Sequence, residues 1–193
     1  MPRQALILDG FEIAIPGSEG LSAGVKAELE ASGFQVAVRP IRNMRIAPCR
    51  ACFDCWLKTP GSCTLRDDFH TIARAYLDSD LAVFWTPVVF GSYGSGMKRV
   101  LERLIGLLTP FLRFEAGETH HPPRYAHNPA LFGLGWPISP DPAWAAVFER
   151  LVARNAANLR SPRYGAAVVM DQADWPGART ALRTFLRAAG SGL

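Results

Sequence analysis

Apolar residues follow two different periodicities along the chain. Short apolar runs, typical of buried parallel strands, occupy residues 5–8, 34–38, 81–85, 130–134 and 166–170. Between these runs, apolar residues recur at helical spacing within residues 22–32, 67–77, 97–108, 144–152 and 181–186. Strands that alternate with helices predict a three-layer, doubly wound parallel sheet. For 193 residues we expect a single α/β domain, residues 1–193, with five strands in the order 2-1-3-4-5.

Two predicted helices have clear end signals. Ser22 is the expected N-cap of the first helix, and Gly33 is its expected stop. Asp67 and Asp68 are expected to open the helix over residues 67–77, because acidic residues suit the positive end of the helix dipole.

One segment, residues 109–129, shows no clear periodicity and is rich in proline and histidine. A connection of this length is typical of a functional or mobile loop. Apart from Glu118, no acidic or thiol partner stands near His120, His121 and His127 at ligand spacing. We therefore expect these histidines to belong to a lid or a subunit contact, and not to a metal site.

Charge and hydropathy exclude several classes of protein. The net charge is +4 and arginine supplies most of the cations, but no run of like charge appears. This predicts a mildly basic surface that attracts phosphorylated ligands, and no nucleic-acid partner. The longest apolar stretch, residues 81–90, is interrupted by Thr86 and Pro87, so we expect no membrane segment and a cytoplasmic location.

The predicted sheet places a ligand site in the loops that follow its strands. In open α/β sheets, ligands bind at the carboxyl ends of the strands, here between the first and third strands. The loop over residues 86–98 carries three glycines within six residues, which lets the backbone approach a flat ligand closely. The loop after the first strand, residues 9–21, lies at the same edge and is called the first loop below. The turn after the fourth strand lies there too.

All four cysteines lie within fifteen residues, at Cys49, Cys52, Cys55 and Cys63. Thiolates at two-residue intervals converge on one point, which suits a metal, a cluster or a redox pair. By count, four thiolates suit an iron–sulfur cluster or zinc equally. A thiol-rich loop that holds no metal is the third interpretation.

The cysteine segment, the Asp67-Asp68 pair and the segment Thr86-Pro-Val-Val-Phe-Gly-Ser together resemble the NADPH-dependent FMN reductase and iron–sulfur flavoprotein family. The resemblance covers about residues 5–108. It implies a flavodoxin-like fold, bound FMN, and hydride transfer from NAD(P)H to the flavin and on to a small acceptor such as a quinone or a flavin. It also implies a homodimer or homotetramer.

The resemblance assigns flavin contacts by position. Those expected against the isoalloxazine ring are Pro87, Val88, Phe90, Gly91, Ser92 and Gly94, with Gly135 and Trp136 after the fourth strand. No side chain needs to act as an acid or a base in such chemistry, so no catalytic residue is expected.

The first loop departs from the family pattern. The family usually has a Gly-Ser-x-Arg segment there, whereas this chain lacks the arginine and carries Glu12 and Glu19. Carboxylates near a phosphate are unfavourable unless they turn outward. The donors that remain for an FMN phosphate at the helix start are Gly17, Ser18, Gly20 and Ser22. We favour a modified FMN site, and a flavin-less binding module is an alternative.

The resemblance also gives a role to the thiols. In the iron–sulfur flavoproteins a similar cysteine pattern holds a [4Fe–4S] cluster, which implies Cys49, Cys52, Cys55 and Cys63 as its ligands. The alternative function is therefore electron transfer through such a cluster, with a ferredoxin-like protein as partner.

Overall fold

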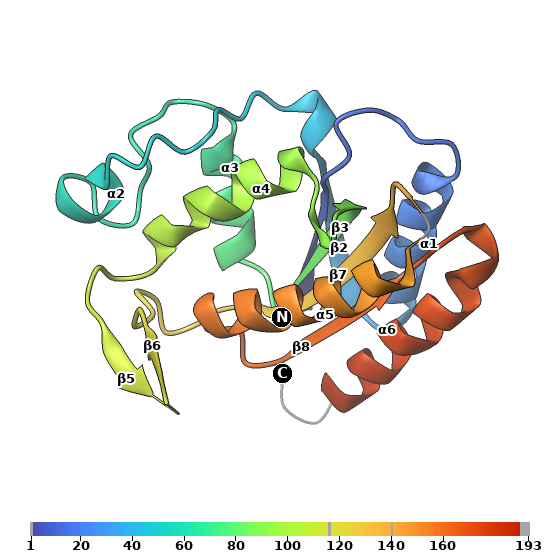
Figure 1. The fold of residues 1–193 in the computed structure, drawn as a ribbon. Coiled ribbons are helices and arrows are strands. Elements are labelled where there is room, and N and C mark those ends of the chain that lie inside the picture. Colours follow the sequence, from blue (N-terminus) through green and yellow to red (C-terminus); the bar gives the residue numbers. More distant parts are fainter. Residues whose placement is uncertain (1, 116, 140, 190–193) are drawn as a thin grey trace.

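The computed structural model describes residues 2–115, 117–139 and 141–189. A parallel sheet with helices on both faces forms its centre (Figure 1). The parallel strands are β1 (Arg3–Asp9), β2 (Phe34–Pro40), β3 (Leu81–Val89), β7 (Ala130–Pro137) and β8 (Tyr164–Val168). Their order, β2-β1-β3-β7-β8, confirms the predicted flavodoxin-like fold with strand order 2-1-3-4-5.

The helices form two layers, one on each face of the sheet. On one face, α1 (Ser18–Ala31) and α6 (Trp175–Ala189) share an apolar core. On the other face lie α3 (Phe69–Leu77), α4 (Ser95–Arg103) and α5 (Pro142–Asn158). The short elements are α2 (Asp54–Leu57), β4 (Ser92–Tyr93), β5 (Arg113–Glu115), β6 (Glu118–His120) and the 3₁₀ turns Ile41–Asn43, Leu104–Leu107 and Gln172–Asp174.

Strand side chains alternate between the two cores, as a pleated sheet requires. In β1, Leu6 and Leu8 join the core under α3, α4 and α5, whereas Ala5 and Ile7 join the core under α1 and α6. The central strand β3 is buried on both faces from Leu81 to Trp85, which explains why this part of its sequence is wholly apolar. Among the described residues, no helix is both long and apolar enough to cross a bilayer.

The first helix begins four residues earlier than predicted, so the assignment of Ser22 as N-cap is wrong. Gly17, with a φ of 89°, is the residue before the helix, and Ser18 donates from its backbone N and its Oγ to the Ile15 carbonyl. That turn starts the helix, and Ser22 lies in its second turn. The predicted stop is confirmed, because Gly33 follows the helix with a φ of 84°.

The next helix, in contrast, begins two residues later than predicted, at Phe69. Asp67 and Asp68 precede it, and their carboxylates accept hydrogen bonds from the backbone N atoms of Ala47 and Arg45, respectively. The acidic pair therefore ties the helix start to the segment that leads into the cysteines.

The segment expected to be a loop, residues 109–129, contains the antiparallel hairpin β5–β6 (Figure 1). Its strands have three residues each, too few to show an alternating pattern in the sequence. Glu118 pairs with Arg154 of α5 at 2.5 Å, and Glu115 pairs with Arg160 at 2.8 Å. These ion pairs fasten the hairpin to the end of α5.

Candidate functional site

A groove of about 290 Å³ opens at the carboxyl ends of β1 and β3. Its walls come from the first loop, the turn after β3 and the end of β7. The lining residues are Gly10, Phe11, Glu12, Ile13, Ile15, Pro87, Val89, Gly94, Ser95 and Ile138. The fold thus brings together the two loops that the sequence predicts to bind a ligand.

Buried contacts hold the start of the first loop in place beneath the groove. Asp9, at the end of β1, is 4% exposed and accepts a hydrogen bond from the backbone N of Phe11 at 3.2 Å. The backbone N of Gly10 donates to the Trp85 carbonyl at 2.7 Å. The ring of Phe11 packs 4.9 Å from that of Trp85. The groove therefore has a rigid floor.

Two arginines from distant parts of the chain neutralise the acidic first loop. Arg42, which follows β2, lies 2.6 Å from Asp9 and 3.5 Å from Glu19. Arg99 of α4 lies 2.6 Å from Glu12. No local sequence pattern indicates these two arginines, because they lie 33 and 87 residues from the carboxylates they contact. They supply the positive charge that the first loop lacks.

Glu12 occupies the N-terminal end of α4, where its carboxylate also accepts a hydrogen bond from Ser95 Oγ. The hydrogen bond from Ser95 is the largest cause that lowers the pKa of Glu12 below its ordinary value of 4.5. Arg99 and the backbone N of Gly96 lower this pKa further, whereas burial raises it. At neutral pH a carboxylate therefore fills a position that favours anions.

The turn after β3 is shaped by left-handed backbone at Phe90, with a φ of 50°, and Gly91, with a φ of 75°. A Cβ on Gly91 would lie 2.5 Å from Val147, so this position also needs glycine for space. The turn leaves the Phe90 side chain 79% exposed, 5.3 Å from the Trp144 ring.

All four cysteines line one small cavity of about 20 Å³. Arg103 and Ile105 share its walls. Burial raises the pKa of the Cys55 thiol, and the other three thiols, at Cys63, Cys49 and Cys52, raise it further. The four sulfur atoms are thus near enough to interact electrostatically, as the sequence spacing indicates.

The backbone around the thiols supplies further polar contacts. Ala51 and Phe53 have positive φ values of 51° and 58°, which turn the chain tightly between the cysteines. The backbone N of Ala51 donates to Cys49 Sγ at 3.4 Å. Among the described residues, no group of three or more His, Cys, Asp or Glu side chains is arranged to hold a metal ion.

A buried ion pair beside the cysteine cavity connects the end of α4 with the segment just before α3. Arg103 and Asp67 lie 2.6 Å apart, with side chains 1% and 6% exposed. Burial opposes ionisation of Asp67, but hydrogen bonds from Arg103 and from the backbone N atoms of Ala47 and Phe69 outweigh it, so the pKa of Asp67 lies below 3.8. Arg103 also donates to the Ala47 carbonyl at 3.1 Å.

The chain matches a known protein family over half of its length. The model of the NADPH-dependent FMN reductase family matches residues 17–115, half of the chain. The chain belongs to this family.

An iron–sulfur flavoprotein from Archaeoglobus fulgidus is 34% identical over 88 residues, which are 46% of this chain and 39% of that protein. The match thus spans about two fifths of the relative's length. The family resemblance inferred from the sequence is confirmed.

Solved structures show the same fold at low sequence identity. An apo NADH:FMN oxidoreductase has a TM-score of 0.66 at 12% identity, covering 96% of this chain and 89% of its own. An NAD(P)H:quinone oxidoreductase from Methanothermobacter marburgensis has a TM-score of 0.66 at 13% identity, covering 98% and 96%. An FMN-dependent NADH-azoreductase from Bacillus anthracis, solved with FMN, has a TM-score of 0.60 at 12% identity, covering 98% of both chains.

In this member of the FMN reductase family, only part of the expected flavin-contact set lines the groove. Pro87 and Gly94 lie in its wall, and Ser92 lies in the adjoining turn. Val88 is packed in the core, where a Cβ on Gly135 would lie 2.5 Å from it. Trp136 packs 6.1 Å from Trp85.

The expected phosphate donors of this FMN reductase family member lie at the start of α1. Gly17 precedes the helix, Ser18 and Gly20 lie in its first turn, and Ser22 lies in its second. Ser18 is buried, and its hydroxyl is already bonded to the Ile15 carbonyl. Within the described residues, none of these four lines the groove.

Proposed function

We propose that the chain is an FMN-dependent NAD(P)H oxidoreductase. It passes a hydride from the nicotinamide to bound flavin and then to a small acceptor such as a quinone or a second flavin. The observation that carries the proposal is the groove at the carboxyl ends of β1 and β3 in a member of the NADPH-dependent FMN reductase family.

The residues around the groove fit a flat heteroaromatic ligand. Close backbone packing is possible because glycine occupies three crowded positions. A Cβ on Gly94 would lie 2.6 Å from Pro87, one on Gly10 would lie 3.0 Å from Met97, and one on Gly96 would lie 2.9 Å from Glu12. The three glycines therefore let the first loop, the turn after β3 and the start of α4 pack closely around the groove.

The chain's own part in the reaction is binding and orientation. FMN, when bound, supplies the hydride chemistry. Apolar side chains of Ile13, Ile15 and Ile138 cover the groove and exclude water from a ring lying there. Arg42 and Arg99 hold the acidic groups beside the groove as ion pairs, which lowers their repulsion of an anionic ligand.

Saturable FMN binding tests this proposal directly. We expect the purified chain to quench FMN fluorescence with a dissociation constant in the micromolar range and to oxidise NADPH only when FMN is present. Gly94→Ala is expected to weaken FMN binding about tenfold, because the added methyl group displaces the Pro87 side chain in the groove wall. Gly177→Ala, on α6, is the matched control, since its Cβ also meets nothing within 4 Å.

A wild-type protein that does not bind FMN saturably would contradict the proposal. That result would support the flavin-less binding module instead.

Electron transfer through an iron–sulfur cluster is a second candidate function, favoured by the convergence of four thiols on one cavity. Arg103 and the backbone N of Ala51 provide positive charge and a hydrogen bond to sulfur, both of which stabilise thiolates. By ligand number and type, though not by their arrangement in the described residues, the four cysteines suit a [4Fe–4S] cluster, with a ferredoxin-like protein as electron partner.

Metal analysis of anaerobically purified protein tests this second function. We expect about four iron atoms and equivalent acid-labile sulfide per chain, and loss of both in Cys55→Ala. Lys58→Ala, an exposed change in the same loop, is the control and should keep the iron. Wild-type protein without iron would reject the cluster, and zinc in its place would identify the other metal that four thiolates suit.

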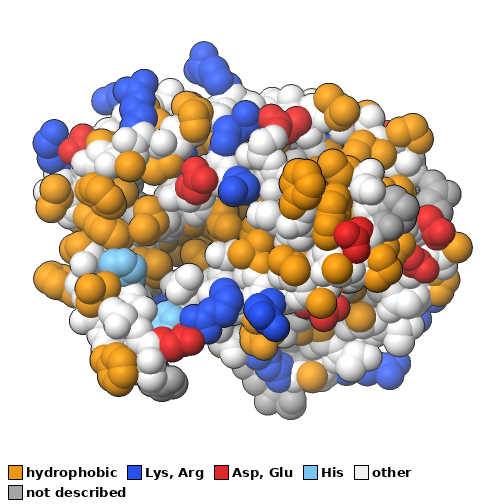
Figure 2. Space-filling view, viewed as in Figure 1, with side chains coloured by type: hydrophobic (Ala, Val, Ile, Leu, Met, Phe, Trp, Pro, Cys, Tyr) orange, Lys and Arg blue, Asp and Glu red, His pale blue; other side chains and the backbone are white. Residues whose placement is uncertain are grey.

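We also propose that the chain forms a homodimer or homotetramer. Apolar side chains gather at the end of the molecule that carries α2 and the hairpin (Figure 2). The most exposed of the large apolar residues there are Leu57, Phe111, Leu112 and Phe114. Exposed apolar patches of this kind support association between chains.

A further inference from the structure

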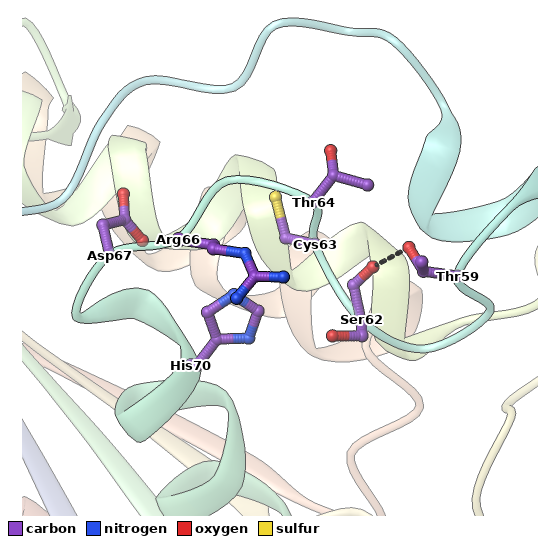
Figure 3. Close-up of a pocket in the computed structure, with 7 residues that line it drawn as sticks. All are labelled: Thr59, Ser62, Cys63, Thr64, Arg66, Asp67 and His70. Atoms are coloured by element: carbon purple, nitrogen blue, oxygen red, sulfur yellow. Dashed lines mark hydrogen bonds between the residues drawn. The ribbon is translucent and has the colours of Figure 1, made fainter.

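A second hollow, of about 600 Å³, lies between the loop after α2 and the start of α3 (Figure 3). Its volume falls in the range typical of small-molecule sites. The lining residues are Thr59, Ser62, Cys63, Thr64, Arg66, Asp67 and His70. None of them lines the groove at the carboxyl ends of β1 and β3. The hollow is thus a separate place in the fold.

The hollow is electropositive because its one carboxylate is already paired. Asp67 is bound by the buried Arg103 at 2.6 Å and by the backbone N of Ala47 at 2.8 Å. Arg66, by contrast, forms no ion pair with any residue that the structure describes. Its guanidinium extends across the hollow beside the His70 ring (Figure 3). An uncompensated guanidinium in a concave site attracts an anion.

Hydroxyl groups complete the donor set. Thr59 Oγ1 donates to the Ser62 carbonyl at 2.7 Å, which fixes the loop (Figure 3). The hydroxyls of Ser62 and Thr64 form no hydrogen bond to another residue in the described part of the chain. His70 is held by its Nε2, 2.8 Å from the Leu65 carbonyl. Guanidinium and hydroxyl donors on a fixed loop are groups that bind phosphate oxygens.

We propose that this hollow binds the phosphate group of a small ligand, with Arg66 as its principal contact and Ser62 and Thr64 as further donors. Cys63 and Thr64 border both this hollow and the thiol cavity. The bound phosphate therefore lies beside the cysteines. The 2′-phosphate of NADP(H) and the phosphate of another metabolite share this chemistry.

Calorimetric titration of the full chain with inorganic phosphate, 2′-AMP and 5′-AMP tests the proposal. We expect saturable binding of phosphate-bearing probes and at least a tenfold loss of affinity in Arg66→Gln, because a bidentate charge-assisted contact is removed. Arg74→Gln removes an exposed arginine from α3 and should leave the affinity unchanged.

The three probes also separate the two sources of phosphate. Tighter binding of 2′-AMP than of 5′-AMP supports the 2′-phosphate of NADP(H), and equal binding supports a general phosphate site. Failure of all three probes to bind wild-type protein, or equal losses in Arg66→Gln and Arg74→Gln, would overturn the proposal. Because none of these titrations involves flavin, their outcome is independent of FMN binding.

Discussion

Replacing Arg103 with Met is expected to lower the free energy of unfolding by about 3–5 kcal/mol, because it leaves the carboxylate of Asp67 buried without its cation. The lost guanidinium also donates to the Ala47 carbonyl and packs 4.2 Å from the Phe69 ring centre. Urea denaturation followed by circular dichroism at pH 7 measures the change.

Arg99→Met is the matched control for this experiment. It removes an arginine–carboxylate pair of the same length one helical turn earlier in α4, but the side chains of Arg99 and Glu12 are 32% and 37% exposed. Its cost should be about 1 kcal/mol or less. If both variants lose the same free energy of unfolding, burial of the Arg103–Asp67 pair does not increase the cost of removing its cation, and this prediction is wrong.

The stabilisation that the Arg103–Asp67 ion pair provides also depends on pH. The pKa of Asp67 is lower in the folded chain than its ordinary value of 3.8. The stabilisation is therefore fully present above pH 3.8 and is lost as pH falls through the folded-state pKa. The difference between wild type and Arg103→Met should be largest at neutral pH and should shrink as the pH falls, because burial raises the pKa of the unpaired Asp67 carboxyl in the variant.

Glu12→Gln is expected to tighten FMN binding about tenfold, a gain of about 1.4 kcal/mol. The carboxylate of Glu12 occupies the N-terminal end of α4 and pairs with Arg99, so it competes with a phosphate for the same positive charge. The amide of glutamine keeps the size of the side chain and removes the competing charge. Fluorescence titration with FMN measures the effect.

Riboflavin separates this charge effect from a change of shape. It has the same ring system without the phosphate, so its affinity should hardly differ between wild type and Glu12→Gln. Glu30→Gln removes the same charge from the far end of α1, where Glu30 pairs with Lys26, and should affect neither ligand. An equal gain for riboflavin and FMN would show that Glu12 acts through shape.

The sequence predicted the sheet because buried strands impose strong local patterns. The apolar run at the start of β3 marks a strand covered on both faces. The short strands of the hairpin were missed, since ion pairs from Glu118 to Arg154 of α5 and from Glu115 to Arg160 just after it hold the hairpin, and such contacts leave no periodic signal. The start of α1 was misplaced because a turn at Ile15, and not a side-chain cap on Ser22, sets it.

At the candidate sites too, the sequence predicts features that depend on neighbouring residues and misses contacts between residues far apart in the chain. Cysteine spacing is local, and the thiols that it predicts to converge do line one cavity. The cations beside the groove come from Arg42 and Arg99, which the chain brings to the first loop only after folding. Loop composition alone therefore suggested an excess of negative charge that the folded protein largely neutralises.

Helix α4 sets the separation between the groove and the thiol cavity. Ser95, its first residue, lines the groove, and Arg103, its last, lines the cavity. The eight residue steps between them (103 − 95) correspond to about 12 Å of helix. One rigid spacer thus fixes the distance between the groove and the thiol cavity, so an insertion within this helix would change that distance.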